Sequence, residues 1–294
     1  MPELPEVETV MRGLAAVLVG QRIAAVRLRR GGLRFPFPQG FAERLTGARV
    51  EGLSRRAKYI LVRLDNGHTL IVHLGMTGRF SVIPAAASAS SLGVFYFEEE
   101  VATGEGPHDH VVLTLEGGSR IVFTDPRRFG LMDLAETACC AEHVRLRGLG
   151  LEPLSNDFNA EALAQRFAGR KAPLKAALLE QRLIAGLGNI YVCEALFRAG
   201  LSPSRRAGTL VKRGRPDPRL EELVRHIRAV LTEAIAAGGS TIRDYAGADG
   251  QEGAFQQRFH VYDREGEACP RCGAAIRRVV QSGRSTFFCG RCQK

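Results

Sequence analysis

The N-terminus of the chain carries two groups that could do covalent chemistry. The sequence opens MPELPEVE, and removal of the initiator methionine before the small Pro2 would expose a secondary amine. An α-amino group has a pKa of about 7.7–8.0, so much of it is neutral near pH 7 and can attack an electrophilic carbon to form an iminium. Glu3 lies beside it and could move protons. Taken alone, the segment favours a helix start decorated with a proline and two glutamates.

The C-terminus carries a candidate metal site. Two CxxC pairs are separated by sixteen residues and supply Cys269, Cys272, Cys289 and Cys292. Four thiolates at this spacing can surround one Zn²⁺ and leave no open position for water, so we predict one structural zinc ion. The alternative, two redox pairs, lacks a surrounding βαβ pattern. From Cys269 to Lys294 there are six basic residues and no acidic one, which suits a phosphate backbone better than a merely solvated surface.

Composition sets the class of protein. The 294 residues are 45% hydrophobic, enough for two domains of ordinary size with a small appendage. No apolar run approaches the length of a membrane span, and the acidic, proline-broken start is unlike an export signal, so we expect a reducing cytoplasm. The net charge of +10 points to nucleic acid or an anionic membrane, and no basic amphipathic helix or lipidation signal favours the membrane.

The first half must then position the N-terminal groups. Residues 5–19 show helical spacing with one apolar stripe, and Gly20 is a plausible stop. From residue 21 the period changes to two. Strands at 60–64 and 69–74 flank Asp65-Asn66-Gly67, and strands at 110–115 and 120–124 flank Glu116-Gly117-Gly118. Repeated hairpins predict a β-sandwich or barrel.

The remaining segments divide the chain further. Residues 84–107 are rich in Ala and Ser and predict a long surface loop with a short strand at 94–97. After Gly150 the pattern becomes helical, which places a domain boundary near 140–152. The predicted helices are one capped by Ser155 or Asn156 and ending at Phe167, then 174–182, 191–199 and 220–237.

A set of motifs in a fixed order carries a family resemblance. These motifs are PELPEVE at 2–8, RRAKY at 55–59, HLGMTGR at 73–79, TDPRRFG at 124–130, GLGNIY at 186–191 and the terminal CxxC pairs. Together they resemble the formamidopyrimidine-DNA glycosylase (MutM) family over essentially the whole chain. The resemblance implies an α+β multidomain fold: an N-terminal helix plus β-sandwich catalytic domain (1–150), a helix–two-turn–helix DNA-binding domain (151–260) and a zinc ribbon (261–294).

The resemblance also implies an activity. The family excises 8-oxoguanine and formamidopyrimidines from damaged double-stranded DNA and then cleaves the abasic strand by β,δ-elimination, as part of base excision repair. We therefore expect a bifunctional glycosylase and lyase that works as a monomer, without a membrane, in the bacterial cytoplasm.

Site roles follow by similarity. Pro2 corresponds to the nucleophile that forms a Schiff base with C1′, Glu3 to its acid/base partner, Lys58 to an assisting lysine near the damaged nucleotide, and Arg284 to a phosphate ligand linked to the later elimination. The positions that match DNA-backbone contacts are His108, Arg128, Lys171 and Asn189. The positions that match the residues inserted into the gap left by the extruded base are Met76, Arg127 and Phe129. On spacing alone, Met76 and Phe129 fit core positions and Arg127 a phosphate clamp.

Two other functions remain open on the sequence. Endonuclease VIII shares the fold and proline chemistry but prefers oxidised pyrimidines; its start usually reads PEGPE, whereas this chain has Leu4 and keeps DPRRFG. A non-catalytic DNA-binding protein would use only the ribbon and the basic helices. The sequence leaves open the preference among damaged purines and the roles of Cys139 and Cys140. Cys193 lies in a predicted helix, and we expect it to be buried in the protein core.

Overall fold

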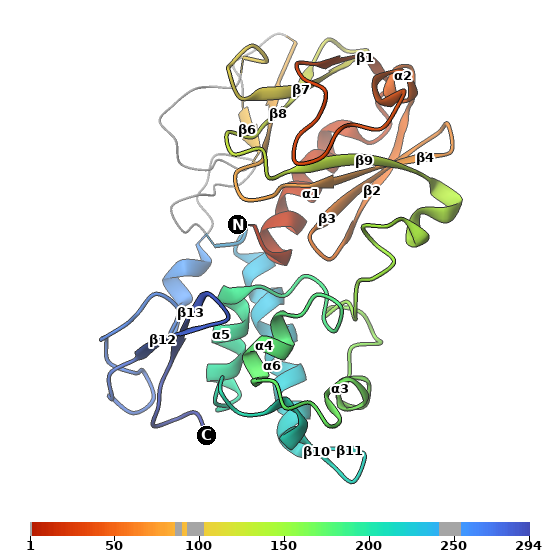
Figure 1. The fold of residues 1–294 in the computed structure, drawn as a ribbon. Coiled ribbons are helices and arrows are strands. Elements are labelled where there is room, and N and C mark those ends of the chain that lie inside the picture. Colours follow the sequence, from red (N-terminus) through yellow and green to blue (C-terminus); the bar gives the residue numbers. More distant parts are fainter. Residues whose placement is uncertain (1, 86–89, 93–102, 241–253) are drawn as a thin grey trace. The chain divides into compact units, whose positions relative to one another are not determined.

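The computed structural model describes residues 2–85, 90–92, 103–240 and 254–294, whose contacts group into two compact units (Figure 1). Unit 1 comprises Met1–Arg147 and Ala237–Ala254, and unit 2 comprises Gly148–Ala236 and Phe255–Lys294. The α-helices are α1 (Leu4–Leu18), α2 (Phe41–Leu45), α3 (Ala160–Phe167), α4 (Leu174–Leu179), α5 (Asn189–Arg198) and α6 (Pro218–Ala236). The strands are β1 (Ile23–Leu28), β2 (Val50–Arg56), β3 (Tyr59–Leu64), β4 (His68–His73), β5 (Arg79–Ile83), β6 (Ser90–Leu92), β7 (Asp109–Leu115), β8 (Arg120–Thr124), β9 (Leu131–Glu136), β10 (Val211–Lys212), β11 (Arg215–Pro216), β12 (Arg277–Gln281) and β13 (Arg284–Phe288).

Unit 1 is a β-sandwich preceded by a helix. One sheet has the order β1-β7-β8-β5-β6 and the other β2-β3-β4-β9, all with antiparallel neighbours. Apolar side chains from both sheets and from α1 form one buried cluster, so the core lies between the layers. Both predicted hairpins, β3–β4 and β7–β8, are confirmed.

Helix α1 is confirmed and is fixed at its start by a capping box. The side chain of Glu3 accepts from the N–H of Glu6, and the Glu6 side chain accepts from the N–H of Glu3. The apolar stripe from Val7 to Leu18 is buried, and the helix ends before Gly20, whose φ is +81°. The capping box therefore fixes the end of the helix that carries Pro2 and Glu3.

Unit 2 contains helices α3 to α6, with two boundaries that differ from the prediction. Helix α3 is capped by Asn159, whose Oδ1 accepts from the N–H of Ala162 at 2.8 Å, so the predicted cap at Ser155 or Asn156 is wrong. Helix α4 ends at Leu179, three residues before the predicted end, and the carbonyl of Glu180 accepts from the N–H groups of Leu183 and Ile184. Strands β10 and β11 form a short antiparallel hairpin between α5 and α6.

The Ala/Ser-rich segment is only partly described. The predicted strand at 94–97 lies outside the described residues. At the described C-terminal end, the carboxylate of Asp109 accepts from the N–H groups of Gly104 and Gly106, both at 3.0 Å. That end is therefore joined to β7.

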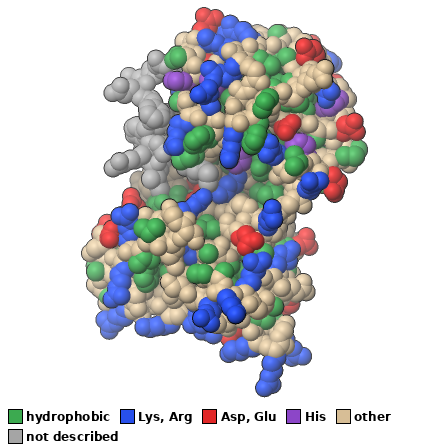
Figure 2. Space-filling model, in the orientation of Figure 1, with side chains coloured by type: hydrophobic (Ala, Val, Ile, Leu, Met, Phe, Trp, Pro, Cys, Tyr) green, Lys and Arg blue, Asp and Glu red, His purple; other side chains and the backbone are tan. Residues whose placement is uncertain are grey.

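Two surface properties accompany this fold. No helix in the described parts of the chain is long and apolar enough to cross a bilayer. On the face in view, Lys and Arg side chains predominate over Asp and Glu on both units (Figure 2), in keeping with the net charge of +10.

Candidate functional site

The start of α1 is a buried, polar environment. Glu3 is only 4% exposed, and its N–H donates to Oε2 of Glu6 at 2.9 Å. The other oxygen of Glu6, Oε1, accepts from the N–H and the hydroxyl of Ser240 at 2.9 and 3.0 Å. Glu6 thus ties the segment carrying Pro2 and Glu3 to residue 240 of the same unit. Sequence reasoning missed Glu6, although the three-residue spacing from Glu3 is the signal of a capping box.

A second contact brings the turn of Lys58 to the same helix. Arg55 donates from Nε to Oε2 of Glu8 at 2.7 Å and from Nη1 to the carbonyl of Ala57 at 2.9 Å. Ala57 has a φ of +53°, so the β2–β3 turn is held in a left-handed conformation that a non-glycine residue rarely adopts. Lys58, the next residue, is 7% exposed. Lys58 is therefore not a solvated surface lysine.

His73, at the end of β4, is a half-buried, neutral histidine. Burial and then the nearby charges of Lys58 and Arg34 lower the pKa of His73 to about 4. Its Nδ1 accepts from the N–H of Gly75 at 2.9 Å, so the proton of the neutral ring is on Nε2, which becomes a donor. Sequence reasoning passed over this residue, although it opens the HLGMTGR motif.

This histidine makes stability depend on pH. The pKa of His73 is lowered from 6.5 to about 4, so the unfolded chain binds the proton more tightly. Its contribution is intact above pH 6.5 and is lost as the pH falls toward 4, by about 2 kcal/mol between pH 7 and 5. In urea unfolding, His73→Asn should flatten this slope, because asparagine does not titrate, and its amide oxygen can still accept from the N–H of Gly75. His68→Asn, at the other end of β4, should keep the slope; equal slopes in all three proteins would contradict the assignment.

A pocket of about 570 Å³ lies in unit 1 beside this histidine. Its lining residues are Leu33, Arg34, His73, Gly75, Met76, Arg127, Arg128 and Phe129. The structure therefore brings together the three residues predicted to insert into DNA. Phe129 is 42% exposed, which excludes the core alternative for it, and the guanidinium of Arg127 lies 4.8 Å from the centre of its ring.

One buried carboxylate sets the spacing of the two turns that carry these residues. Asp125, fully buried, accepts from the hydroxyl of Thr77 at 2.5 Å and from the N–H of Gly130 at 2.8 Å. Thr77 in turn accepts from the N–H of Arg127 at 3.2 Å. A Cβ at Gly75 would lie 2.3 Å from the carbonyl carbon of Phe129, so only glycine permits this approach. The two turns are thus one rigid assembly.

The other predicted backbone contacts are surface residues. His108 is exposed, and its carbonyl accepts from the N–H of Asp125 at 3.0 Å, which places it beside the same assembly. Arg128 is exposed with a φ of +56°. Lys171, in unit 2, is exposed as well.

Unit 2 holds a second cluster around the β12–β13 hairpin. The carbonyl of Ser285 accepts from Nδ2 of Asn189 and from Nζ of Lys175, each at 2.9 Å, and Lys175 also donates to Thr286 Oγ1 at 2.6 Å. Arg284, the preceding residue, is exposed at the start of β13. Asn189 at the first position of α5 and Lys175 on α4 therefore fix the hairpin end that presents Arg284.

This cluster also contains two buried polar groups, the side chain of Lys175 and the Oδ1 atom of Asn189. Lys175 is 1% exposed, and sequence reasoning missed it, although a lone lysine inside the apolar helix LKAALL was a signal. The Oδ1 atom of Asn189 is buried and has no hydrogen-bond partner among the described residues. A buried acceptor of this kind requires a donor, such as a water molecule ordered by a ligand.

The four predicted cysteines converge. The sulfur atoms of Cys269, Cys272, Cys289 and Cys292 all lie within 4.8 Å of one another. Zinc–sulfur bonds of about 2.3 Å in a tetrahedron require sulfurs about 3.8 Å apart, so this cluster fits a tetrahedral zinc ion. The residues packed around it include Cys193, which is buried as predicted. Within the described residues, this is the one cluster of three or more ligand-type side chains.

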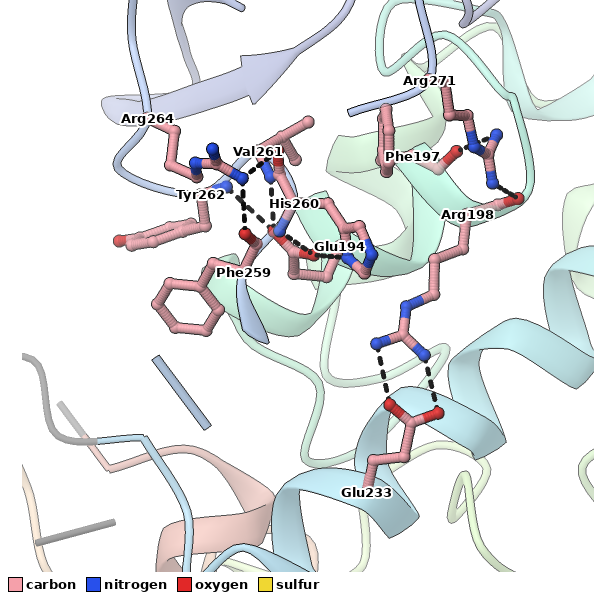
Figure 3. Close-up of polar contacts among 10 residues, drawn as sticks. All are labelled: Glu194, Phe197, Arg198, Glu233, Phe259, His260, Val261, Tyr262, Arg264 and Arg271. Atoms are coloured by element: carbon pink, nitrogen blue, oxygen red, sulfur yellow. Dashed lines mark hydrogen bonds and ion pairs between the residues drawn. The ribbon is translucent and has the colours of Figure 1, made fainter. Parts of the chain in front are cut away.

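A buried carboxylate on α5 anchors the chain that leads into the ribbon (Figure 3). Glu194, fully buried, accepts from the N–H groups of His260, Val261 and Tyr262 at 2.9 Å each, and its Oε2 lies 3.1 Å from Nδ1 of His260. Burial alone would raise the pKa of Glu194, but these hydrogen bonds outweigh it and hold the pKa below its usual value.

Arg271, between two of the cysteines, anchors the ribbon at the other end of α5. Its guanidinium donates to the carbonyls of Phe197 and Arg198 at 3.0 and 2.9 Å and lies 4.6 Å from the Phe197 ring (Figure 3). These carbonyls lie at the C-terminal end of the helix, and that of Phe197 also accepts from the N–H of Gly200 at 3.0 Å. Arg198 itself pairs with both oxygens of Glu233 on α6. The ribbon and the chain leading into it are thus held by Glu194 and Asn189 of α5 and by Lys175 of α4. Arg271 of the ribbon adds the contact with the C-terminal end of α5.

Three family models match the chain in sequence order. They are the formamidopyrimidine-DNA glycosylase N-terminal domain over residues 1–132, the formamidopyrimidine-DNA glycosylase H2TH domain over 149–246, and a zinc finger found in FPG and IleRS over 266–294. The second and third matches fall on segments that contain α5 and the cysteine cluster.

Individual proteins match over their full length. A formamidopyrimidine-DNA glycosylase of Rhizobium meliloti is 56% identical, with 100% of both chains covered. Among solved structures, MutM (Fpg) of Thermus thermophilus is 39% identical with a TM-score of 0.82, covering 99% of this chain and 98% of that one. Lactococcus lactis Fpg bound to DNA containing N7-benzyl-Fapy-dG is 32% identical with a TM-score of 0.83, covering 100% of each chain.

Proposed function

Because this chain belongs to the formamidopyrimidine-DNA glycosylase family, we propose that it excises 8-oxoguanine and formamidopyrimidines from duplex DNA and then cleaves the strand by β,δ-elimination. The observation that carries the proposal is the buried start of α1, where Glu3 is held by Glu6 and where Arg55 and Glu8 bring the turn of Lys58 to the same helix. An amine, a carboxyl group and a lysine are the groups that Schiff-base chemistry requires.

In this mechanism the neutral amine of Pro2 attacks C1′ of the damaged nucleotide. The C1′–N bond to the base breaks, the base leaves with a proton, and opening of the sugar ring gives an iminium between Pro2 and C1′. Glu3 and Lys58 serve the proton transfers. The iminium acts as an electron sink, so loss of a proton from C2′ expels the 3′-phosphate, and the second elimination expels the 5′-phosphate with the assistance of Arg284.

Extrusion of the damaged base leaves a gap that costs a few kcal/mol. We assign Met76 and Phe129 to filling it and Arg127 to hydrogen bonding with the orphaned base. The exposed ring of Phe129 and the shared pocket support this assignment, and the link from Thr77 to Asp125 fixes the spacing of the two turns.

Several segments then grip the DNA backbone. We assign His108, Arg128, Lys171 and Asn189 to phosphates, and the buried Oδ1 of Asn189 that lacks a partner among described residues supports an ordered ligand there. We retain 1–150 as the catalytic domain, 151–260 as the helix–two-turn–helix domain and 261–294 as the ribbon, which one structural zinc ion would order through the four thiolates. The partner is damaged double-stranded DNA, bound by a monomer in the bacterial cytoplasm.

Single-turnover excision tests the substrate class. With matched duplexes, 8-oxoguanine opposite cytosine should be released at least about tenfold faster than thymine glycol, a difference of about 1.4 kcal/mol in the barrier. The measurement is base release followed by gel analysis of the strand ends. Faster release of thymine glycol would favour an endonuclease VIII-like function, and release of neither base would favour a DNA-binding protein without catalysis.

A further inference from the structure

Four arginines around the pocket of unit 1 lack acidic partners. Arg34, Arg127 and Arg128 line the pocket, and Arg145 stacks on Phe35, the residue that follows Arg34. None of the four forms an ion pair with a carboxylate among the described residues. Elsewhere in the unit such pairs are common: Arg55 is 2.7 Å from Glu8, and Arg63 is 2.9 Å from Glu51. Unpaired positive charge concentrated at one place is complementary to a polyanion.

Two of these arginines stack on an exposed aromatic ring. The guanidinium of Arg145 lies 3.8 Å from the centre of the Phe35 ring and that of Arg34 lies 5.6 Å from it. Phe35 is 37% exposed, and Nε of Arg145 is buried without a hydrogen-bond partner in the described part of the chain. Stacking orients the guanidinium of Arg145 and leaves its terminal N–H groups available to a phosphate.

The loop that carries Arg34 and Phe35 is built as a rigid element. The N–H of Arg34 donates to the carbonyl of Gly130 at 3.1 Å, which joins the loop to the turn of Phe129. The N–H of Phe37 donates across the loop to the carbonyl of Gly31 at 2.9 Å. A Cβ at Gly32 would lie 2.5 Å from the carbonyl oxygen of Phe35, so the loop is tight. Arg34 therefore keeps a fixed place relative to the insertion residues.

We propose that Arg34 and Arg145, held by Phe35, bind phosphates of the strand opposite the lesion. The inference rests on the proposed function, because it takes the inserted side chains to face the orphaned base. The pocket lining includes Met76, Arg127 and Phe129 but none of the residues assigned to bond making at Pro2, Glu3 and Lys58. The DNA backbone of the orphaned nucleotide then passes over Arg34. Its phosphates meet arginines that form no ion pair with a carboxylate among the described residues.

The preference for duplex over single-stranded DNA tests this contact. The probe is a 15-nucleotide strand with a tetrahydrofuran abasic analogue, used alone and annealed to its complement. Arg145→Ala should lower the ratio of duplex to single-strand affinity about tenfold and reduce the salt slope of duplex binding by about one. Phe35→Ala should act in the same direction, whereas Phe35→Trp should retain the ratio because it preserves the stack. Arg147→Ala, an exposed arginine two residues from Arg145, is the matched control and should retain the ratio.

A chemical change in the DNA identifies the strand. Methylphosphonates placed singly along the undamaged strand should weaken binding of the unmodified enzyme at one or two positions, and Arg145→Ala should be insensitive to the same replacements. Equal loss on duplex and single strand, full sensitivity of Arg145→Ala to the replacements in the undamaged strand, or an unchanged ratio would each overturn the proposal. Borohydride trapping by the unmodified enzyme tests the proposed function separately, so a duplex-specific loss in an enzyme that fails to trap would leave this contact standing.

Discussion

A protein carrying an extra peptide ahead of Pro2 should form no borohydride-trapped adduct with abasic DNA, a loss of at least about a thousandfold. The reason is chemical: an extension converts the amine of Pro2 into an amide, which has no basic lone pair for attack on C1′. The neighbouring Glu3 cannot replace it, because a carboxyl group forms no iminium. The measurement is a gel shift of labelled DNA after reduction.

The same tag at the C-terminus is the matched control and should leave trapping intact. Pro2→Gly keeps an amine and should trap more slowly, because a primary amine replaces the secondary one. Glu3→Gln should slow the reaction by about 10²–10⁴-fold while retaining DNA binding. Robust trapping by the N-terminally extended protein would show that another amine is the nucleophile.

Replacing one cysteine of the cluster should have the second largest effect. Cys289→Ser removes one of four thiolates within 4.8 Å of one another, so zinc content should fall and affinity for damaged duplex should drop about a hundredfold. Cys289 packs in the ribbon core with Phe287 of β13, and the same strand presents Arg284 at its start. Loss of zinc should therefore loosen the strand that carries Arg284. Metal analysis and fluorescence anisotropy measure the two quantities together.

The control for this change is Cys139→Ser, an exposed cysteine outside the cluster, which should keep both zinc and affinity. Thermal unfolding of unit 1 should be nearly unchanged in either variant, because its core cluster contains no ribbon residue. Freshly purified protein with a metal-to-protein ratio near zero, or Cys289→Ser with full affinity, would contradict the zinc assignment.

The sequence by itself determined the elements whose signals are local. Period-two runs around Asp65-Asn66-Gly67 predicted the β3–β4 hairpin, and an apolar stripe predicted α1, because residues two to four apart decide both patterns. The CxxC spacing set the convergence of four sulfurs, since a tight turn holds each pair. The cap of α3 was misjudged, because Ser155, Asn156 and Asn159 all suit that role and packing selects among them.

Only the tertiary structure decided which polar groups are buried and what they hold. Glu194 meets the N–H groups of residues 66 to 68 positions away, Lys175 meets Ser285 across 110 positions, and Glu6 meets Ser240 across 234. No local pattern records such pairings, because a buried charge is tolerated only where distant chain segments supply its hydrogen bonds. The same holds for His73, whose lowered pKa results from burial and from charges brought close by other loops. The sequence motifs were sufficient to predict the site residues. The contacts between distant chain segments determine how rigidly each of these residues is held.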